Sequence, residues 1–215
     1  MPLVREVIGD EPAVVLGLPR GGVVVAAELA DALACPLDVL VVRKVGVPGH
    51  RELAMGAVTA GTVVRNDDVV RAAGVTDATF DEAVSRERDV VAQRERAYRD
   101  LRAAESLEGR VAVVVDDGLA TGATAGAALS ALRARDRDIP ARVVLAVPVG
   151  PPDTLTDLAS ACDDVVRVLA PRFFTAVGAW YDDFDQVADS EVSALLAAHP
   201  HRDSSARSSR SSRPR

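Results

Sequence analysis

Two adjacent acids follow an apolar run in the middle of the chain. Asp116 and Asp117 come directly after five apolar residues, Val111–Val115, and precede a short stretch rich in glycine, alanine and threonine. Neighbouring carboxylates repel each other unless something neutralises them. They are also acceptors suited to a diol or a hydrated metal ion. The pattern therefore predicts a binding site rather than a plain turn.

The residues after the acids add donors for an anion. Residues 120–124 are small or hydroxylated and lead into a sequence of helical pattern. Free amides at a helix start, reinforced by the helix dipole, hold phosphate groups, and Thr121 and Thr124 can add hydroxyl donors. Small side chains let the backbone approach such an anion closely. A ribose 5-phosphate fits both halves, whereas an Asp-rich helix cap would explain only one aspartate.

The elements that must position these residues alternate along the chain. Apolar, valine-rich runs predict strands, and periodic stretches between them predict helices. The strands are expected at 13–18, 36–43, 111–117, 141–149 and 163–170, and the helices at 22–33, 122–135 and 152–161. This order predicts an α/β fold with an open, mainly parallel sheet flanked by helices. In such sheets ligands bind beyond the carboxyl ends of the strands, near the switch in strand order.

Residues 46–109 interrupt the alternation. They predict an inserted hairpin that turns at Ala60-Gly61, followed by a long helix with a capping box at Thr79 and Glu82. Apolar residues at helical spacing predict one buried stripe, made of Phe80, Val84, Val91, Tyr98 and Leu101. The opposite face is interpreted as solvated and salt-bridged; it carries Arg86, Glu87, Arg88, Arg94, Glu95 and Arg96. The helix packs either on the core or on a second subunit.

Composition sets the remaining limits. With 215 residues and a formal net charge of −7, the chain is expected to form one domain over residues 1–201, in the cytoplasm and outside any membrane. Cys35 and Cys162 are interpreted as small core residues that bind no metal. Residues 202–215 hold five arginines, many serines and one aspartate, which predicts a disordered Ser/Arg-rich tail. The acidic body argues against nucleic acid as the main partner.

The stretch VVVDDGLATGAT, residues 113–124, closely resembles the phosphoribosyl-diphosphate (PRPP) binding motif of type I phosphoribosyltransferases. In that family the two acids hold the ribose hydroxyls and the loop holds the 5-phosphate. The resemblance therefore implies a type I phosphoribosyltransferase fold with a small C-terminal hood. It assigns the ribose and 5-phosphate to Asp116, Asp117, Gly118, Ala120, Thr121, Gly122, Ala123 and Thr124.

Three further stretches agree with this resemblance. It assigns the pyrophosphate to Pro19, Arg20, Gly21 and Gly22 after the first strand, and to Arg43 and Lys44 at the end of the second. Arg20, Lys44, Asp116 and Asp117 are then the candidate catalytic residues. His50, Arg51 and Glu52 lie in a glycine-rich segment, 46–56, that is the candidate flap. An aromatic, acidic segment supplies a candidate acceptor hood with Trp180, Tyr181 and Asp183, whereas Phe173 and Phe174 are expected in the core.

The whole pattern, over about residues 4–198, resembles a bacterial group of phosphoribosyltransferase-domain proteins with no settled acceptor. It implies transfer of phosphoribosyl from PRPP to a nitrogenous base or a related small acceptor. It also implies that Mg²⁺ binds mainly through PRPP and through Asp116 and Asp117, and that the protein is a homodimer. The alternative is a PRPP- or nucleotide-binding regulator without catalysis. Ala120 stands where hypoxanthine-guanine enzymes carry an aspartate, which disfavours a 6-oxopurine mechanism. The residues "GLPRGG" lack the spacing of a dinucleotide-binding fingerprint.

Overall fold

A five-stranded parallel sheet forms the centre of the molecule in the computed structural model, which describes residues 2–99 and 103–199. Its strand order is β2-β1-β6-β7-β8. The bounds are Ala13–Gly17 for β1, Leu37–Val39 for β2, Val111–Val115 for β6, Arg142–Val149 for β7 and Asp164–Leu169 for β8. The order confirms the predicted open parallel sheet. It places the switch in strand order beside β1 and β6, which pair in register from Ala13 and Val111 to Gly17 and Val115.

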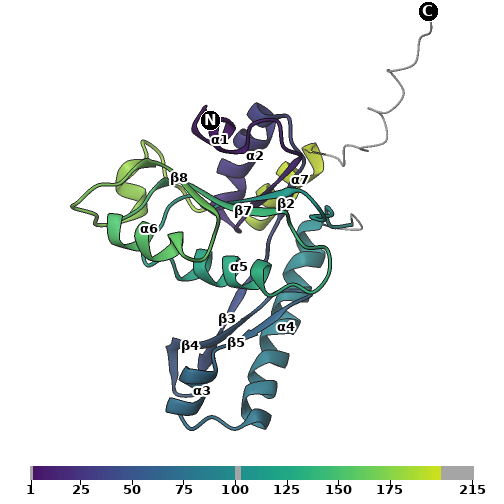
Figure 1. Ribbon diagram of the computed structural model, residues 1–215, viewed down its shortest axis with the longest axis vertical. Coiled ribbons are helices and arrows are strands. Elements are labelled where there is room, and N and C mark those ends of the chain that lie inside the picture. The colour runs from purple at the N-terminus through teal and green to yellow at the C-terminus, as the bar shows by residue number, and fades with distance from the viewer. Residues whose placement is uncertain (1, 100–102, 200–215) are drawn as a thin grey trace, which may run out of the picture.

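Helices cover both faces of this sheet (Figure 1). One face packs against α1 (Pro2–Ile8), α2 (Gly21–Leu33) and α7 (Asp189–Ala198). The other face packs against α5 (Ala123–Arg133) and α6 (Pro152–Ala159). Successive residues of β6 alternate between the two apolar clusters and are all buried, as expected for a strand covered on both sides.

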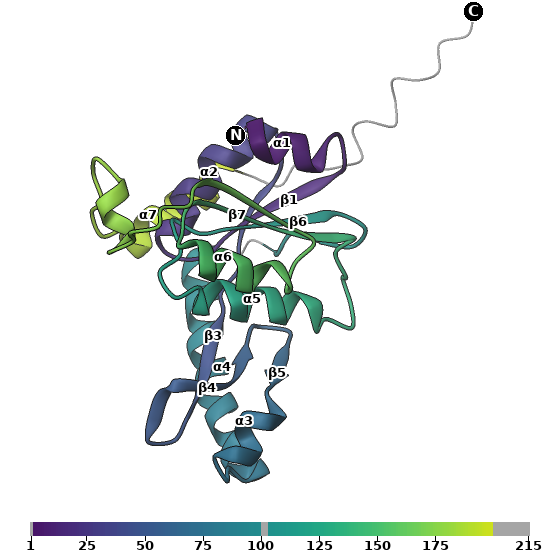
Figure 2. The ribbon, with the colours of Figure 1, turned by 60° about the vertical axis from the view of Figure 1, so that its left-hand side comes forward.

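A second lobe extends from the sheet and contains the predicted insertion (Figures 1 and 2). Strands β3 (Arg43–Val47), β4 (His50–Val58) and β5 (Val63–Arg65) form an antiparallel sheet, followed by α3 (Asp67–Ala72) and α4 (Asp77–Arg99). The turn between β4 and β5 contains Ala60 and Gly61, as predicted. Four members of the predicted stripe are buried, namely Phe80, Val84, Val91 and Tyr98, and Leu101 lies outside the described residues.

The predicted capping box is wrong by three residues. Helix α4 begins at Asp77, so Thr79 lies inside its first turn. Thr76 is the cap, because its Oγ1 accepts a hydrogen bond from the Thr79 backbone N–H at 3.2 Å. Both positions carry threonine, and the composition of the segment could not distinguish them.

The predicted second strand, residues 36–43, is also wrong in its extent. Strand β2 ends at Val39, and Arg43 begins β3, which pairs with β4 in the other sheet. Leu40 and Val41, which connect the two strands, are buried. The apolar run therefore continues across the break between the sheets, and its pattern gives no sign of the change in partner.

Several short elements were not predicted from the sequence. They are α1, α3, α7 and the 3-10 helix η1 (Val177–Trp180), which lies in the segment after β8 (Figure 2). Cys162 is buried, as predicted, and Cys35 is half-buried. None of the helices within residues 2–99 and 103–199 combines the length and apolar character that a membrane span requires. The predicted tail at 202–215 lies outside the described residues.

Candidate functional site

The two acids lie at the carboxyl end of the central strand β6, next to the switch in strand order. Both side chains are half-buried, and Asp116 Oδ1 accepts a hydrogen bond from the Asp117 backbone N–H at 3.0 Å. The neighbouring strand β1 ends at Gly17, and Leu18 donates its N–H to the Val115 carbonyl at 2.8 Å. The segments after β1 and β6 are thus held together at the edge where ligands bind in open parallel sheets.

Burial perturbs both carboxylates, and the charge of Asp117 adds to the effect on Asp116. Burial, with a further contribution from the charge of Asp117, raises the pKa of Asp116 from its ordinary 3.8 to about 7. Burial also raises the pKa of Asp117. Ionising both groups is therefore costly until a ligand donates hydrogen bonds or a cation approaches. Paired, perturbed carboxylates at a strand end are typical of functional sites.

The first turn of α2 packs directly against this pair. A Cβ at Gly21 would lie 1.9 Å from Asp117 Oδ2, and a Cβ at Gly22 would lie 2.7 Å from the Val115 carbonyl oxygen. Gly22 therefore needs glycine for its close approach to the backbone of β6, whereas a side chain at Gly21 would displace the Asp117 carboxylate. The adjoining residues, Pro19 and Arg20, are half-buried, and the peptide bond between them is cis. The structure thus brings the predicted pyrophosphate loop onto the predicted ribose acids.

The loop after the acids turns sharply into α5. Gly122 precedes the helix with a φ of +67°, in the left-handed region that favours glycine. Thr121 Oγ1 accepts a long hydrogen bond from the Ala123 backbone N–H at 3.4 Å. A Cβ at Gly122 would also meet Thr154 Cγ2 at 2.7 Å. Thr121 and Thr124 are exposed, so their hydroxyls can reach a ligand. This geometry, with helix-start amides beside threonine hydroxyls, matches the phosphate loop expected from the sequence.

Arg43 and Lys44 do not end a strand of the central sheet, as the sequence suggested, but begin β3. The Arg43 Nε pairs with Glu87 Oε2 of α4 at 2.8 Å, so this guanidinium already has a partner in the second lobe. Side chains alternate along a strand, so Lys44 points to the opposite face of β3 from Arg43. Because Arg43 is paired with Glu87, Lys44 is the one of these two cations that remains available to a ligand.

The predicted flap is a hairpin rather than an irregular loop. Strands β3 and β4 pair up to Val47 and His50 and turn through Pro48 and Gly49, with irregular register on either side of Gly46. His50 is exposed, and Arg51 and Glu52 lie in the same strand, β4. Glycine and proline in this stretch serve the turn, where Gly49 has a φ of +81°.

The segment after β8 folds back over the acids, as predicted for a hood. The Tyr181 hydroxyl donates a hydrogen bond to the Asp117 carbonyl oxygen, and its ring lies 5.0 Å from that of Phe184. A Cβ at Gly118 would lie 2.6 Å from Val177 Cγ1, which shows how closely η1 packs on the acidic turn. Sequence reasoning included Tyr181 but missed Val177, whose role depends on a contact about sixty residues away along the chain.

An open cavity of about 330 Å³, called the hood cavity below, lies between the hood and α2 beside Asp117. Its lining includes Gly21 of α2, the Tyr181 and Phe184 rings, and the acids Asp183, Asp185 and Glu191. Trp180 is 40% exposed. The expectation that Phe173 belongs to the core is wrong, because its side chain is 92% exposed, and Phe174 is only half-buried.

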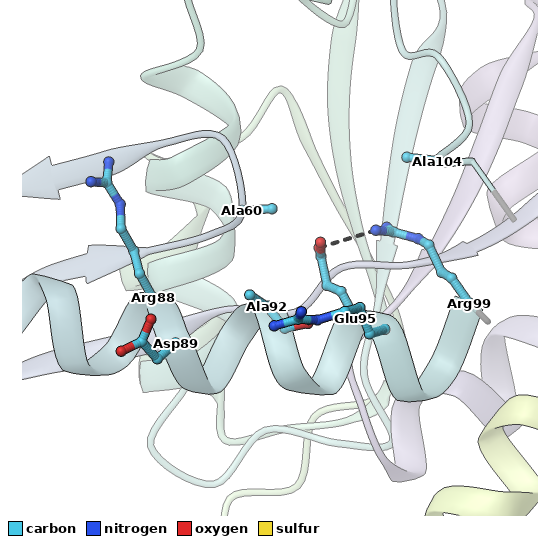
Figure 3. A pocket seen from close by; sticks show the side chains of 8 residues that line it. Ala60, Arg88, Asp89, Ala92, Glu95, Arg99 and Ala104 are labelled. Carbon is cyan, nitrogen blue, oxygen red and sulfur yellow. Dashed lines mark hydrogen bonds and ion pairs between the residues drawn. The ribbon is translucent and has the colours of Figure 1, made fainter. Parts of the chain in front are cut away.

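A separate hollow lies beside α4 (Figure 3), and neither Asp116 nor Asp117 lines it. It is lined by Ala60 of the β4–β5 turn and by charged residues of α4 that include Arg88, Asp89 and Arg96. Glu95 and Arg99 form an ion pair across 3.1 Å within it. The arginines of the predicted solvated face are exposed, whereas Glu87 and Glu95 are half-buried in ion pairs with Arg43 and Arg99.

Comparisons with known proteins point to one family. Residues 3–179 match the family described as "Phosphoribosyl transferase domain". Two Mycobacterium tuberculosis proteins, from strains CDC 1551 and H37Rv, each named "Putative phosphoribosyl transferase", are 50% identical over 199 residues. The match covers 91% of this chain and 44% of each relative, so the chain spans less than half the length of these relatives.

A solved structure shares the fold over nearly the whole chain. It is the crystal structure of TT1426 from Thermus thermophilus, with 43% identity, a TM-score of 0.82 and 92% of each chain covered. The chain therefore belongs to the phosphoribosyl transferase domain family, and its mostly parallel sheet flanked by helices is the type I fold of that family.

Proposed function

We propose that the chain is a phosphoribosyltransferase that moves phosphoribosyl from PRPP to a nitrogenous base or a related small acceptor and releases pyrophosphate. One observation carries this proposal: the paired acids, the glycine loop before α2 and the loop before α5 meet at the switch point of the sheet. Diol acceptors, phosphate donors and a cationic loop are the groups that PRPP requires. Family membership supports the same chemistry.

In this proposal each group has one role. Asp116 and Asp117 accept hydrogen bonds from the ribose hydroxyls, and the backbone and hydroxyls of residues 120–124 hold the 5-phosphate. The bond from ribose C1 to the pyrophosphate oxygen breaks, and a bond from C1 to an acceptor nitrogen forms. The pyrophosphate leaves with the bonding electron pair. Arg20 and Lys44 stabilise its negative charge, which is the effect that preorganised cations supply best.

The acids also fit a magnesium ion. Mg²⁺ takes oxygen ligands and commonly combines one or two carboxylates with substrate phosphates. Asp116 and Asp117 would be its protein ligands here, since the two carboxylates are adjacent at the end of β6 and the start of α2 packs against them. Among the described residues there is no cluster of three or more His, Cys, Asp or Glu side chains able to hold a metal. We propose that the ion binds mainly through PRPP. When bound, the ion would neutralise the charge of the pyrophosphate.

The reacting carbon must also be shielded from water. Tyr181 fixes the hood to the Asp117 carbonyl, and we propose that the β3–β4 hairpin, with His50, Arg51 and Glu52, is the mobile flap. Ala120 provides no carboxylate to handle a purine proton, so the proposal favours acceptors other than 6-oxopurines.

Pyrophosphate release tests the proposal. The protein is incubated with PRPP, Mg²⁺ and a panel of nitrogenous bases, and an Asp116→Asn/Asp117→Asn variant serves as the control. We expect acceptor-dependent pyrophosphate release that the variant lacks. Tight PRPP binding with no release across the panel would favour the non-catalytic regulator instead.

A further inference from the structure

An apolar groove runs next to the hood cavity. It has a volume of about 290 Å³ and is bounded by α1, α2, strands β6 to β8 and the ring of Tyr181. Among the described residues that line it, only Glu28 and Tyr181 carry a polar group on the side chain. Cavities lined in this way take apolar parts of ligands.

The groove lies directly beside the cavity next to the acids and shares part of its lining. Val24, Val25 and Tyr181 line both spaces, and Asp117 lines the cavity. Tyr181 is fixed at this boundary by its hydrogen bond to the Asp117 carbonyl. A single molecule can therefore extend from the acidic turn, past the tyrosine ring, into the groove.

The groove has a buried floor and an exposed outer rim. Leu29, Ala146 and Val166 of its lining are buried, whereas Leu3 is 41% and Val168 is 65% exposed. The exposed apolar side chains at the rim would gain contacts from an apolar group of a ligand that lies in the groove. Since the groove shares its inner lining with the cavity beside the acidic turn, a ligand of that turn is the occupant that the geometry favours.

We propose that the acceptor carries an apolar substituent that lies in this groove, while its planar nitrogenous head lies in the hood cavity. The proposal rests on the proposed function for the position of the head, beside the Tyr181 and Phe184 rings and facing Asp183, Asp185 and Glu191. It narrows the acceptor class to amphiphilic bases, in contrast to a bare polar nucleobase.

A ligand series tests the groove without requiring turnover. Benzamidine and its 4-methyl, 4-propyl and 4-butyl derivatives combine a planar cationic head with an apolar chain of increasing length. Their dissociation constants are measured by calorimetry on the full chain, without PRPP. Burial of a methylene group is worth about 0.8 kcal/mol, so we expect affinity to rise about fourfold with each added methylene. A flat series, in which the dissociation constant does not change with chain length, would overturn the proposal.

Three variants test whether the dependence of affinity on chain length arises in the groove. Val25→Thr keeps the side-chain shape but adds a hydroxyl to the groove, and it should flatten the dependence on chain length. Val7→Thr makes the same change in α1 outside the groove lining and should leave the series unchanged. Glu191→Gln should weaken all members by a similar factor, because it acts on the head. An unchanged series in Val25→Thr would contradict the assignment.

The failure of this inference and that of the proposed function can be told apart. A steep series together with absent Mg·PRPP binding would remove the proposed function and keep the groove as a ligand site. A flat series together with normal PRPP binding would remove only the groove. Sedimentation velocity on the same samples tests a second copy as the occupant: a dimer that Val25→Thr dissociates, with a flat series, would assign the groove to subunit contact.

Discussion

The two glycines at the start of α2 should respond differently to replacement by alanine: Gly22→Ala should lower stability, and Gly21→Ala should lower PRPP affinity. The three atoms nearest to a methyl group at Gly21 would all belong to the side chain of Asp117: Oδ2 at 1.9 Å, Cγ at 2.7 Å and Cβ at 3.2 Å. A methyl group at Gly22 would meet the Val115 carbonyl oxygen at 2.7 Å and Asp116 Cα at 2.9 Å, which belong to the backbone of β6 and the turn after it. A carboxylate can rotate away, whereas the end of a central strand cannot.

These contacts determine the expected changes in the free energy of unfolding and in PRPP affinity. Overpacking against a fixed neighbour costs about 1–3 kcal/mol, and replacing glycine by alanine in a helix returns at most about 1 kcal/mol. Gly22→Ala should therefore lower the free energy of unfolding by about 1–2 kcal/mol. Gly21→Ala should stay within about 1 kcal/mol of wild type. It should nevertheless displace Asp117 and remove a charged hydrogen bond to the ribose, worth about 1.5–3 kcal/mol, or roughly 10- to 100-fold in PRPP affinity.

Urea unfolding and calorimetric titration with Mg·PRPP measure the two effects separately. Gly61→Ala is the matched control, because nothing lies within 4 Å of the added methyl group. It should leave both quantities unchanged. If Gly21→Ala and Gly22→Ala lost equal stability and kept PRPP affinity, the contact between α2 and Asp117 would not have the role given to it here.

Three other outcomes are expected. Asp116→Asn should stabilise the metal-free protein at pH 8 by an amount on the order of 2–4 kcal/mol. The pKa of Asp116 is raised from an ordinary 3.8 to about 7, so the stability of the wild type falls as pH rises from about 4 to 7. Denaturant titrations should therefore show that the stabilisation by Asp116→Asn shrinks toward pH 4. Lys44→Ala should weaken pyrophosphate and PRPP binding about tenfold or more and spare ribose 5-phosphate, whereas equal losses for all three would refute its placement. Trp180→Leu should raise the acceptor KM with PRPP affinity nearly unchanged; poor PRPP binding and lost stability would show a structural role instead.

The sequence predicted the central sheet and the acidic site because both depend on local patterns. The Val111–Val115 run, the acids after it and the small residues before α5 lie within fifteen residues of one another. Their periodicity and side-chain chemistry are readable without knowledge of the fold. The parallel arrangement of the strands follows from the alternation of strands and helices, whereas the pairing of β1 with β6 is known only from the structure.

The sequence failed where tertiary contacts decide the structure. The run through Leu40 and Val41 stays apolar while the chain passes from one sheet to the other, so Arg43 and Lys44 were assigned to the wrong strand. Phe173 was placed in the core on hydrophobicity alone, although its side chain is 92% exposed. The contact of Gly21 with Asp117 joins segments nearly one hundred residues apart and has no local signature.

Calorimetric titration of Mg·PRPP into the wild-type protein and into the Asp116→Asn/Asp117→Asn variant tests the central claim most directly. The variant keeps the size of both side chains, and circular dichroism and urea unfolding verify that it is folded. We predict saturable binding to the wild type and a loss of at least about 100-fold in the variant, since two charged hydrogen-bond acceptors are removed. Equal affinities for the two folded proteins would contradict the assignment of the ribose site to the end of β6.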